Sequence, residues 1–196
     1  MLVTVSLSIA TAQTEKGRWT VGADVGGLSY QDQDVYKTFS ANLTPSAGYF
    51  IANNLVIGTG VPLSLTKQAA SGIISRYTGT GIGLSPFIRY YFGPASVKPY
   101  VGLSYNYTYI NRQYVTPTGD ASGKGYSTAF APTLGIAYFT NRNVALNAGL
   151  NYNIETQESP ALNFSGQPSR VPTVVTFKSE NKLLSLNIGF QLFFGK

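Results

Sequence analysis

The strongest constraint on this sequence is an alternation of period two whose strand centres carry almost no charge. In the last segment, every second residue from Leu184 to Phe194 is apolar, and most of the residues between them are small or polar. This is the side-chain period of a β-strand, because successive side chains point to opposite faces. The alternation predicts eight strands, near residues 18–30, 38–51, 54–67, 76–92, 97–115, 126–140, 143–155 and 174–194.

The connections between these strands alternate in length. Short turns are expected at 52–54, 93–96 and 141–143, and longer polar loops near 31–37, 68–75, 116–125 and 156–173. Alternation of this kind puts the short turns at one end of an up-and-down meander and the loops at the other. Neither a change of composition nor an internal repeat marks a second domain. We therefore expect one closed antiparallel sheet.

The kind of polar residue indicates which face meets lipid. Alternation alone also describes a soluble, lipocalin-like barrel with an apolar interior. A water-facing surface would carry many Lys and Glu, yet of 14 basic and 8 acidic residues only Asp24 and Arg89 fall in strand centres. Because a charge at the membrane midplane costs about 2–4 kcal/mol, this distribution favours an all-β, eight-stranded antiparallel up-and-down transmembrane β-barrel.

Aromatic residues gather near both ends of the predicted outward face. Near the short turns these are Trp19, Tyr49, Tyr90, Phe92, Tyr138 and Phe194, and near the long loops they are Phe39, Tyr105, Tyr107, Tyr109, Phe130 and Tyr152. Two aromatic girdles around an aliphatic band are typical of a membrane barrel. The alternative, that aromatics are merely good strand formers, explains their number but not their placement.

The composition excludes several kinds of chemistry. The chain has no His and no Cys, so it contains neither a histidine general base, nor a His/Cys metal site, nor a disulfide. We expect no catalytic residue, no cofactor and no metal. Asp32 and Asp34 could ligate calcium weakly, but without EF-hand spacing they indicate a solvated acidic loop. The basic residues are dispersed over separate loops, so we expect no nucleic-acid partner.

The first residues indicate an export signal. Met1 to Gln13 carries no charge and ends in the small-residue pattern Ala10-Thr11-Ala12. We expect residues 1–12 to be a signal peptide, or the end of one, and residues 13–196 to be a single barrel domain. The alternative is that this segment is a buried first strand.

With these features the chain resembles the small outer-membrane barrels of the OmpA/OmpX type. The sharpest local likeness is the C-terminal strand, where the family's assembly signal is represented by Asn187, Gly189, Leu192 and Phe194, although Gly195 and Lys196 follow the final Phe. The resemblance implies a place in the bacterial outer membrane, reached through the periplasm. It also implies contact with membrane lipid and lipopolysaccharide, folding by the assembly machinery, and a monomer.

Four structural expectations follow from the pattern. Both termini and the short turns should face the periplasm. The last two strands should protrude beyond the membrane before the loop turns back, and so offer an edge to a partner strand. Asp24 and Arg89, both inward by parity, should face each other across the lumen, directly or through water or polar neighbours. Interruptions of the sheet are expected at several of the in-strand prolines, which are Pro45, Pro62, Pro86, Pro99 and Pro132.

Three functions remain open on the sequence. The first is a non-enzymatic barrel that presents loops for adhesion, surface interaction or envelope integrity. The second is a narrow passive channel, although an eight-stranded barrel has room for little beyond its own side chains. The third, a membrane-embedded enzyme, is disfavoured by the missing histidine. We favour the first.

Overall fold

The computed structural model describes residues 12–34, 36–70, 76–117, 119–163 and 173–195. A short 3-10 helix, η2 (Ala12–Thr14), precedes the strands. The strands are β1 (Trp19–Gln33), β2 (Tyr36–Ala52), β3 (Leu55–Gly60), β4 (Leu63–Ala70), β5 (Arg76–Tyr91), β6 (Val97–Thr116), β7 (Gly119–Phe139), β8 (Val144–Asn163) and β9 (Thr173–Phe194). Among the described residues, no helix is long and apolar enough to cross a membrane.

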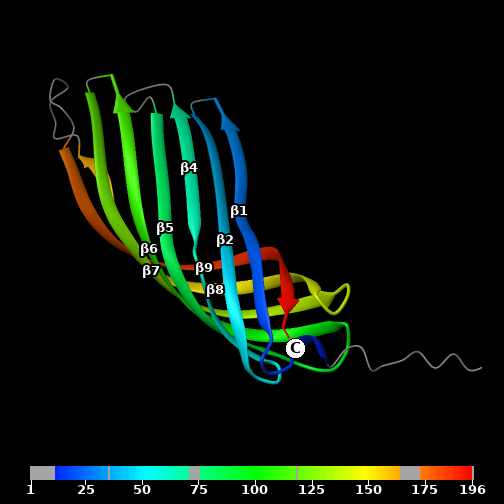
Figure 1. The fold of residues 1–196 in the computed structure, drawn as a ribbon. Helices are drawn as coiled ribbons and strands as arrows, with labels where there is room; N and C mark the ends of the chain where they lie inside the picture. The colour runs from blue at the N-terminus through cyan, green and yellow to red at the C-terminus, as the bar shows by residue number, and fades with distance from the viewer. Residues whose placement is uncertain (1–11, 35, 71–75, 118, 164–172, 196) are drawn as a thin grey trace, which may run out of the picture.

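All neighbouring strands pair antiparallel, and the sheet closes on itself. β1 pairs with β2 on one side and with β9 on the other, so the first and last strands complete the ring (Figure 1). β3 and β4 both lie between β2 and β5 and together make one pass of the barrel. The predicted eight-stranded up-and-down barrel is confirmed, with its third strand divided in two.

Proline accounts for that division and for other gaps in the ladders. Pro62, between β3 and β4, has no N–H to donate, and the pairing with β2 lapses beside it, where only the Val61 N–H reaches the Pro45 carbonyl at 2.8 Å. The β5–β6 ladder is interrupted at Pro86 and the β7–β8 ladder at Pro132. Pro99, by contrast, lies within an unbroken β6–β7 ladder, opposite Ile136.

Several connections are shorter than the sequence predicts. The expected loops at 31–37 and 116–125 are largely strand: β1 and β2 pair as far as Gln33↔Tyr36, and β6 and β7 pair as far as Thr116↔Gly119. These ends have polar residues on both faces. A hairpin that rises out of the membrane has water on both sides, so its strands need no alternation of apolar and polar residues. Without that alternation, the sequence predicts a loop where the structure has paired strands.

The last hairpin rises in the same way, as predicted. β8 and β9 pair continuously from Val144↔Leu192 to Asn163↔Thr173. The expected loop at 156–173 is therefore strand over its first part, and its remainder lies outside the described residues. The barrel thus has a short-turn end, with the turns at 53–54, 92–96 and 140–143, and a long-hairpin end opposite (Figure 1).

Candidate functional site

The outer face of the barrel is an exposed apolar belt. It includes Leu84, Ile88, Leu134, Ile136, Leu146, Leu150, Leu186 and Ile188, each more than 40% exposed. The aromatic residues expected in the girdles also lie on this face. Trp19, Tyr90, Phe92, Tyr138, Phe194, Phe39, Tyr105, Tyr107, Tyr109, Phe130 and Tyr152 are exposed, and Tyr49 is half-buried against Trp19 at 4.9 Å between ring centroids.

Inside the barrel, the short-turn end is closed by packed rings. We call Phe50, Tyr91, Tyr100, Phe139 and Phe193 the aromatic floor; each is at most 3% exposed, and neighbouring rings lie 5.1–6.5 Å apart. Glycine on the opposite wall makes room for one of them, because a Cβ at Gly149 would lie 2.6 Å from the Tyr100 hydroxyl. Rings in such contact fill the interior of the barrel at this end.

The segment before β1 covers the floor from below. Its Thr14 side chain is 1% exposed, donates to Asn54 Oδ1 at 2.5 Å, and accepts from Lys98 Nζ at 3.0 Å. Arg18 donates to three backbone carbonyls: Gln13 at 3.2 Å, Arg142 at 3.0 Å and Phe193 at 3.1 Å. These bonds tie the N-terminal segment to a short turn and to the end of the last strand.

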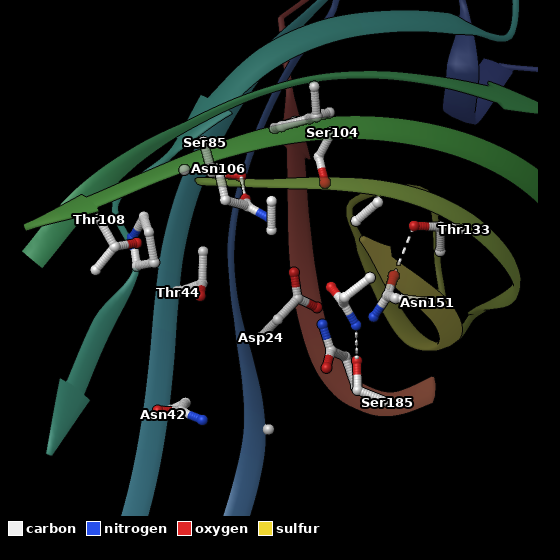
Figure 2. A pocket seen from close by; sticks show the side chains of 18 of the residues that line it. Asp24, Asn42, Thr44, Ser85, Ser104, Asn106, Thr108, Thr133, Asn151 and Ser185 are labelled. Carbon is white, nitrogen blue, oxygen red and sulfur yellow. Dashed lines mark hydrogen bonds between the residues drawn. The ribbon is translucent and has the colours of Figure 1, made fainter. Parts of the chain in front are cut away.

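Above the floor, the lumen is a polar cup of about 490 Å³. Hydroxyl and amide side chains from nearly every strand point into it, among them Asn42, Thr44, Ser85, Ser104, Asn106, Thr108, Thr133, Asn151 and Ser185 (Figure 2). Many of them bond across strands: Thr133 Oγ1 donates to Asn151 Oδ1 at 2.6 Å, and Asn153 Nδ2 donates to Ser185 Oγ at 2.8 Å. The cup therefore offers neutral hydrogen-bonding groups from most of the strands that form its wall.

The two lumen charges do not touch. Asp24 accepts from Asn147 Nδ2 at 2.6 Å, whereas Arg89 donates to the Tyr91 hydroxyl at 3.3 Å and stacks 4.4 Å from the Tyr100 ring centroid. No direct contact joins them, because Arg89 lies against the rings of the floor while Asp24 is bonded to β8. A pair mediated by water or polar neighbours stays a prediction. Both residues line the cup.

The residues of the proposed assembly signal lie where β9 meets β1. Asn187 pairs with Gly26 and Gly189 with Asp24, while Leu192 and Phe194 face outward and are 41% and 45% exposed. A Cβ at Gly189 would lie 2.5 Å from the Ala23 carbonyl and would also meet the Asp24 carboxylate. Glycine is therefore required at this position by packing alone, whatever part it has in assembly.

The sequence reasoning missed the aromatic floor and the clamp made by Arg18. A signal for the floor was present, since aromatics occur in adjacent pairs at the short-turn ends: Tyr49-Phe50, Tyr90-Tyr91, Tyr138-Phe139 and Phe193-Phe194. One member of each pair must point inward. Arg18 gave no such signal, because its partners are backbone carbonyls far away in the chain.

A closed antiparallel ring with a lipid-facing apolar belt and a polar interior defines an integral β-barrel of the bacterial outer membrane. The chain belongs to the family of the outer membrane protein beta-barrel domain, which it matches over residues 1–194. The resemblance to small outer-membrane barrels and the outer-membrane location are thereby confirmed. No curated protein sequence matches the chain significantly.

Solved structures share this fold at low sequence identity. The outer membrane protein OprG from Pseudomonas aeruginosa is 14% identical, with a TM-score of 0.58 over 94% of this chain and 99% of OprG. A major outer membrane protein from Thermus thermophilus is 14% identical (TM-score 0.52; 92% and 100% covered). Ail, the attachment invasion locus protein of Yersinia pestis, is 10% identical (TM-score 0.51; 91% and 99% covered). At these identities the likeness extends to the fold alone.

Proposed function

We propose that the protein is a non-enzymatic, non-conducting outer-membrane barrel that presents its long hairpins and the open cup above the floor to the surroundings. The observation that carries this proposal is the aromatic floor, whose side chains are at most 3% exposed across the short-turn end. A floor of this kind favours presentation over the alternative, a narrow passive channel, since a solute would have to displace several packed rings.

Planar-bilayer recording tests this proposal. The wild-type protein should give no steady openings, whereas Tyr91→Ala, which removes a ring from the middle of the floor, should give discrete ones. Heat-modifiable migration on gels first establishes that each sample is a folded barrel, since a folded barrel runs compact until boiled. Steady openings of the folded wild type would instead support the channel.

The orientation proposed with this function has the short turns and the N-terminal segment on the periplasmic side. It is supported by the difference in length between the two ends of the barrel. An epitope inserted next to Gly119, at the tip of the β6–β7 hairpin, should be reached by antibody on intact cells. The same epitope at Asn141 should be reached only after permeabilisation, and the opposite result would contradict the orientation.

The outward basic residues at the long-hairpin end are proposed to meet lipopolysaccharide phosphates. Lys67 is exposed and pairs across the sheet with Phe39, at the upper limit of the apolar belt, and Arg76 is exposed on the neighbouring strand. Lys37, beside them, is partly neutralised by Asp32 at 3.0 Å. The proposed state is a monomer that reaches the membrane through the assembly machinery.

A further inference from the structure

The ladder that joins the first strand to the last is shorter than either strand. β1 pairs with β9 only from Trp19↔Phe194 to Gly26↔Asn187, although β1 continues to Gln33 and β9 begins at Thr173. Above Gly26, the ladders of the described residues join β1 to β2 and β9 to β8, but not the two to each other. In Figure 1 the upper parts of β1 (blue) and β9 (orange) lie on opposite sides of the barrel.

A bulge in β1 marks the point where the two strands part. The register with β2 shifts between Gly26 and Ser29, and Gly27 has a φ of 59°. A β-bulge bends its strand, and here β1 keeps its pairing with β2 as far as Gln33. The positive φ favours glycine at this position, and a side chain there would also displace the Asn42 amide. The gap in the wall therefore begins at a defined bend in β1, not at a frayed strand end.

We call the gap between residues 27–33 of β1 and 173–186 of β9 the side slot. Its lower rims continue the apolar belt: Leu28 and Tyr30 on β1 are 69% and 65% exposed, and Leu184 and Leu186 on β9 are 59% and 60% exposed. Charges begin only above them, at Asp32 and Lys182. The lower part of the slot therefore lies at the depth of the lipid leaflet on the long-hairpin side.

On its inner side, the slot opens into the polar cup. Gly27 on one rim, and Leu183 and Ser185 on the other, line that cavity, as do Gly26 and Asn187, the last pair below the slot. Leu183 is inward by parity, yet 57% exposed, so the passage is apolar at its entrance and polar further in. Backbone groups along both rims lack a strand partner across the slot, which is unfavourable in hydrocarbon unless water or another polar group satisfies them.

We propose that the side slot admits an amphiphile from the adjacent leaflet, whose head group enters the cup while its hydrocarbon chain stays between the apolar rims. The head group is zwitterionic or uncharged and rich in hydrogen-bonding oxygens. Such a group can satisfy the free backbone groups of the rims, which a purely apolar molecule cannot. The cup holds two carboxylates, Asp24 and Glu155, and one guanidinium, Arg89, and its other polar groups are neutral, so it does not favour a strongly anionic head.

Quenching of single tryptophans by brominated lipid tests the proposal. Trp19 is the only tryptophan, so Trp19→Phe gives a silent background. In that background, Leu183→Trp reports from the inner side of the slot, Leu186→Trp from its lipid-facing rim, and Ser104→Trp from the wall of the cup on β6. The proteins are folded into vesicles of phosphatidylcholine with or without dibrominated acyl chains. We expect at least two-fold quenching at positions 183 and 186 and little at 104.

A cross-link that closes the slot distinguishes two sources of quenching at position 183. One is a lipid acyl chain that enters the slot, and the other is lipid that stays outside the barrel wall. The chain contains no cysteine, so Leu28→Cys with Leu186→Cys can be bridged across the slot by a short bis-maleimide, which adds to both thiols, in protein that retains Leu183→Trp. The control bridges Val25→Cys with Ile188→Cys, which are already paired just below the slot. The slot bridge should remove most of the quenching at position 183, and the control bridge should leave it.

Two results would overturn the proposal. One is an unquenched Trp at 183 when Trp at 186 is quenched, and the other is quenching at 183 that survives the slot bridge. Neither result would affect the non-conducting function, which is measured separately as conductance of the wild type.

Discussion

Arg18→Met should be among the most destabilising single changes outside the strands. The Arg18 side chain is 4% exposed and donates to the carbonyls of Gln13, Arg142 and Phe193, which belong to three separate parts of the chain. Burial lowers the pKa of Arg18, with Glu15 opposing, but a guanidinium stays charged at neutral pH. Methionine keeps much of the length and apolar contact but none of the donors.

The magnitude follows from the three carbonyls left without their charged donor. At about 1–1.5 kcal/mol each, the expected loss in the free energy of unfolding is about 3–5 kcal/mol. Urea titration of the folded protein in micelles measures it, with Trp19, the next residue, as the fluorescent reporter. Arg76→Met, at an exposed position on β5, is the matched control and should change stability by less than about 0.5 kcal/mol. A loss below about 1 kcal/mol for Arg18→Met, with an unchanged denaturant slope, would refute this reasoning.

Three further changes test other parts of the barrel. Gly189→Ala should cost about 1–3 kcal/mol by the same titration, because its Cβ would lie 2.5 Å from the Ala23 carbonyl; an unchanged midpoint would show that the β1–β9 ladder can yield. A double-mutant cycle between Asp24→Asn and Arg89→Met should give a coupling energy below about 1 kcal/mol, because the two side chains have separate direct partners and can interact only through water or polar neighbours; a larger value would show that they pair directly. Asp32→Asn should lower the pKa of the Lys37 ammonium toward its ordinary value, because the hydrogen bond and charge of Asp32 raise that pKa in the folded protein. The contribution of the pair to folding stability is therefore fully present below the ordinary pKa of lysine and is lost as the pH rises through the raised pKa. NMR titration of Lys37 measures this, and an unchanged pKa would show that the ion pair does not persist in solution.

Alternation was enough to predict the barrel within the membrane, because there each strand has lipid on one side and a polar lumen on the other. Leu186 and Asn187 differ in polarity for that reason alone. Above the membrane both faces of a strand are exposed to water and the alternation ends. The pattern therefore predicts a loop at residues such as Gly119 and Ser122, although they are part of β7. At Pro62 the sequence shows that a backbone donor is missing, but it does not show the consequence for the strand. Whether the strand bends, bulges or divides there depends on its neighbours on β2 and β5.

For the site, parity placed Asp24 and Arg89 in the lumen but could not choose their partners. Arg89 lies over Tyr100 because β5 and β6 are adjacent and the ring is inward, whereas Asp24 reaches β8 across β9. Such choices depend on the register between strands distant in sequence. The same holds for the β1–β9 ladder, which ends at Gly26↔Asn187 although the alternation of β9 continues beyond it.

The aromatic floor also bears on the order in which the molecule can be made. Its rings come from residues 50, 91, 100, 139 and 193, which lie in strands beside the short turns, the last of them as the penultimate residue of β9. Contacts of such long sequence separation make folding slow, because most of the chain must be brought together before any of them form. Phe193 lies in β9, the last strand to join the ring, so the floor cannot be completed before β9 has paired. Deletion of the end of β9 that carries Phe193 should therefore yield no closed barrel at all, whereas deletion of a hairpin tip at the opposite end should yield a shorter barrel.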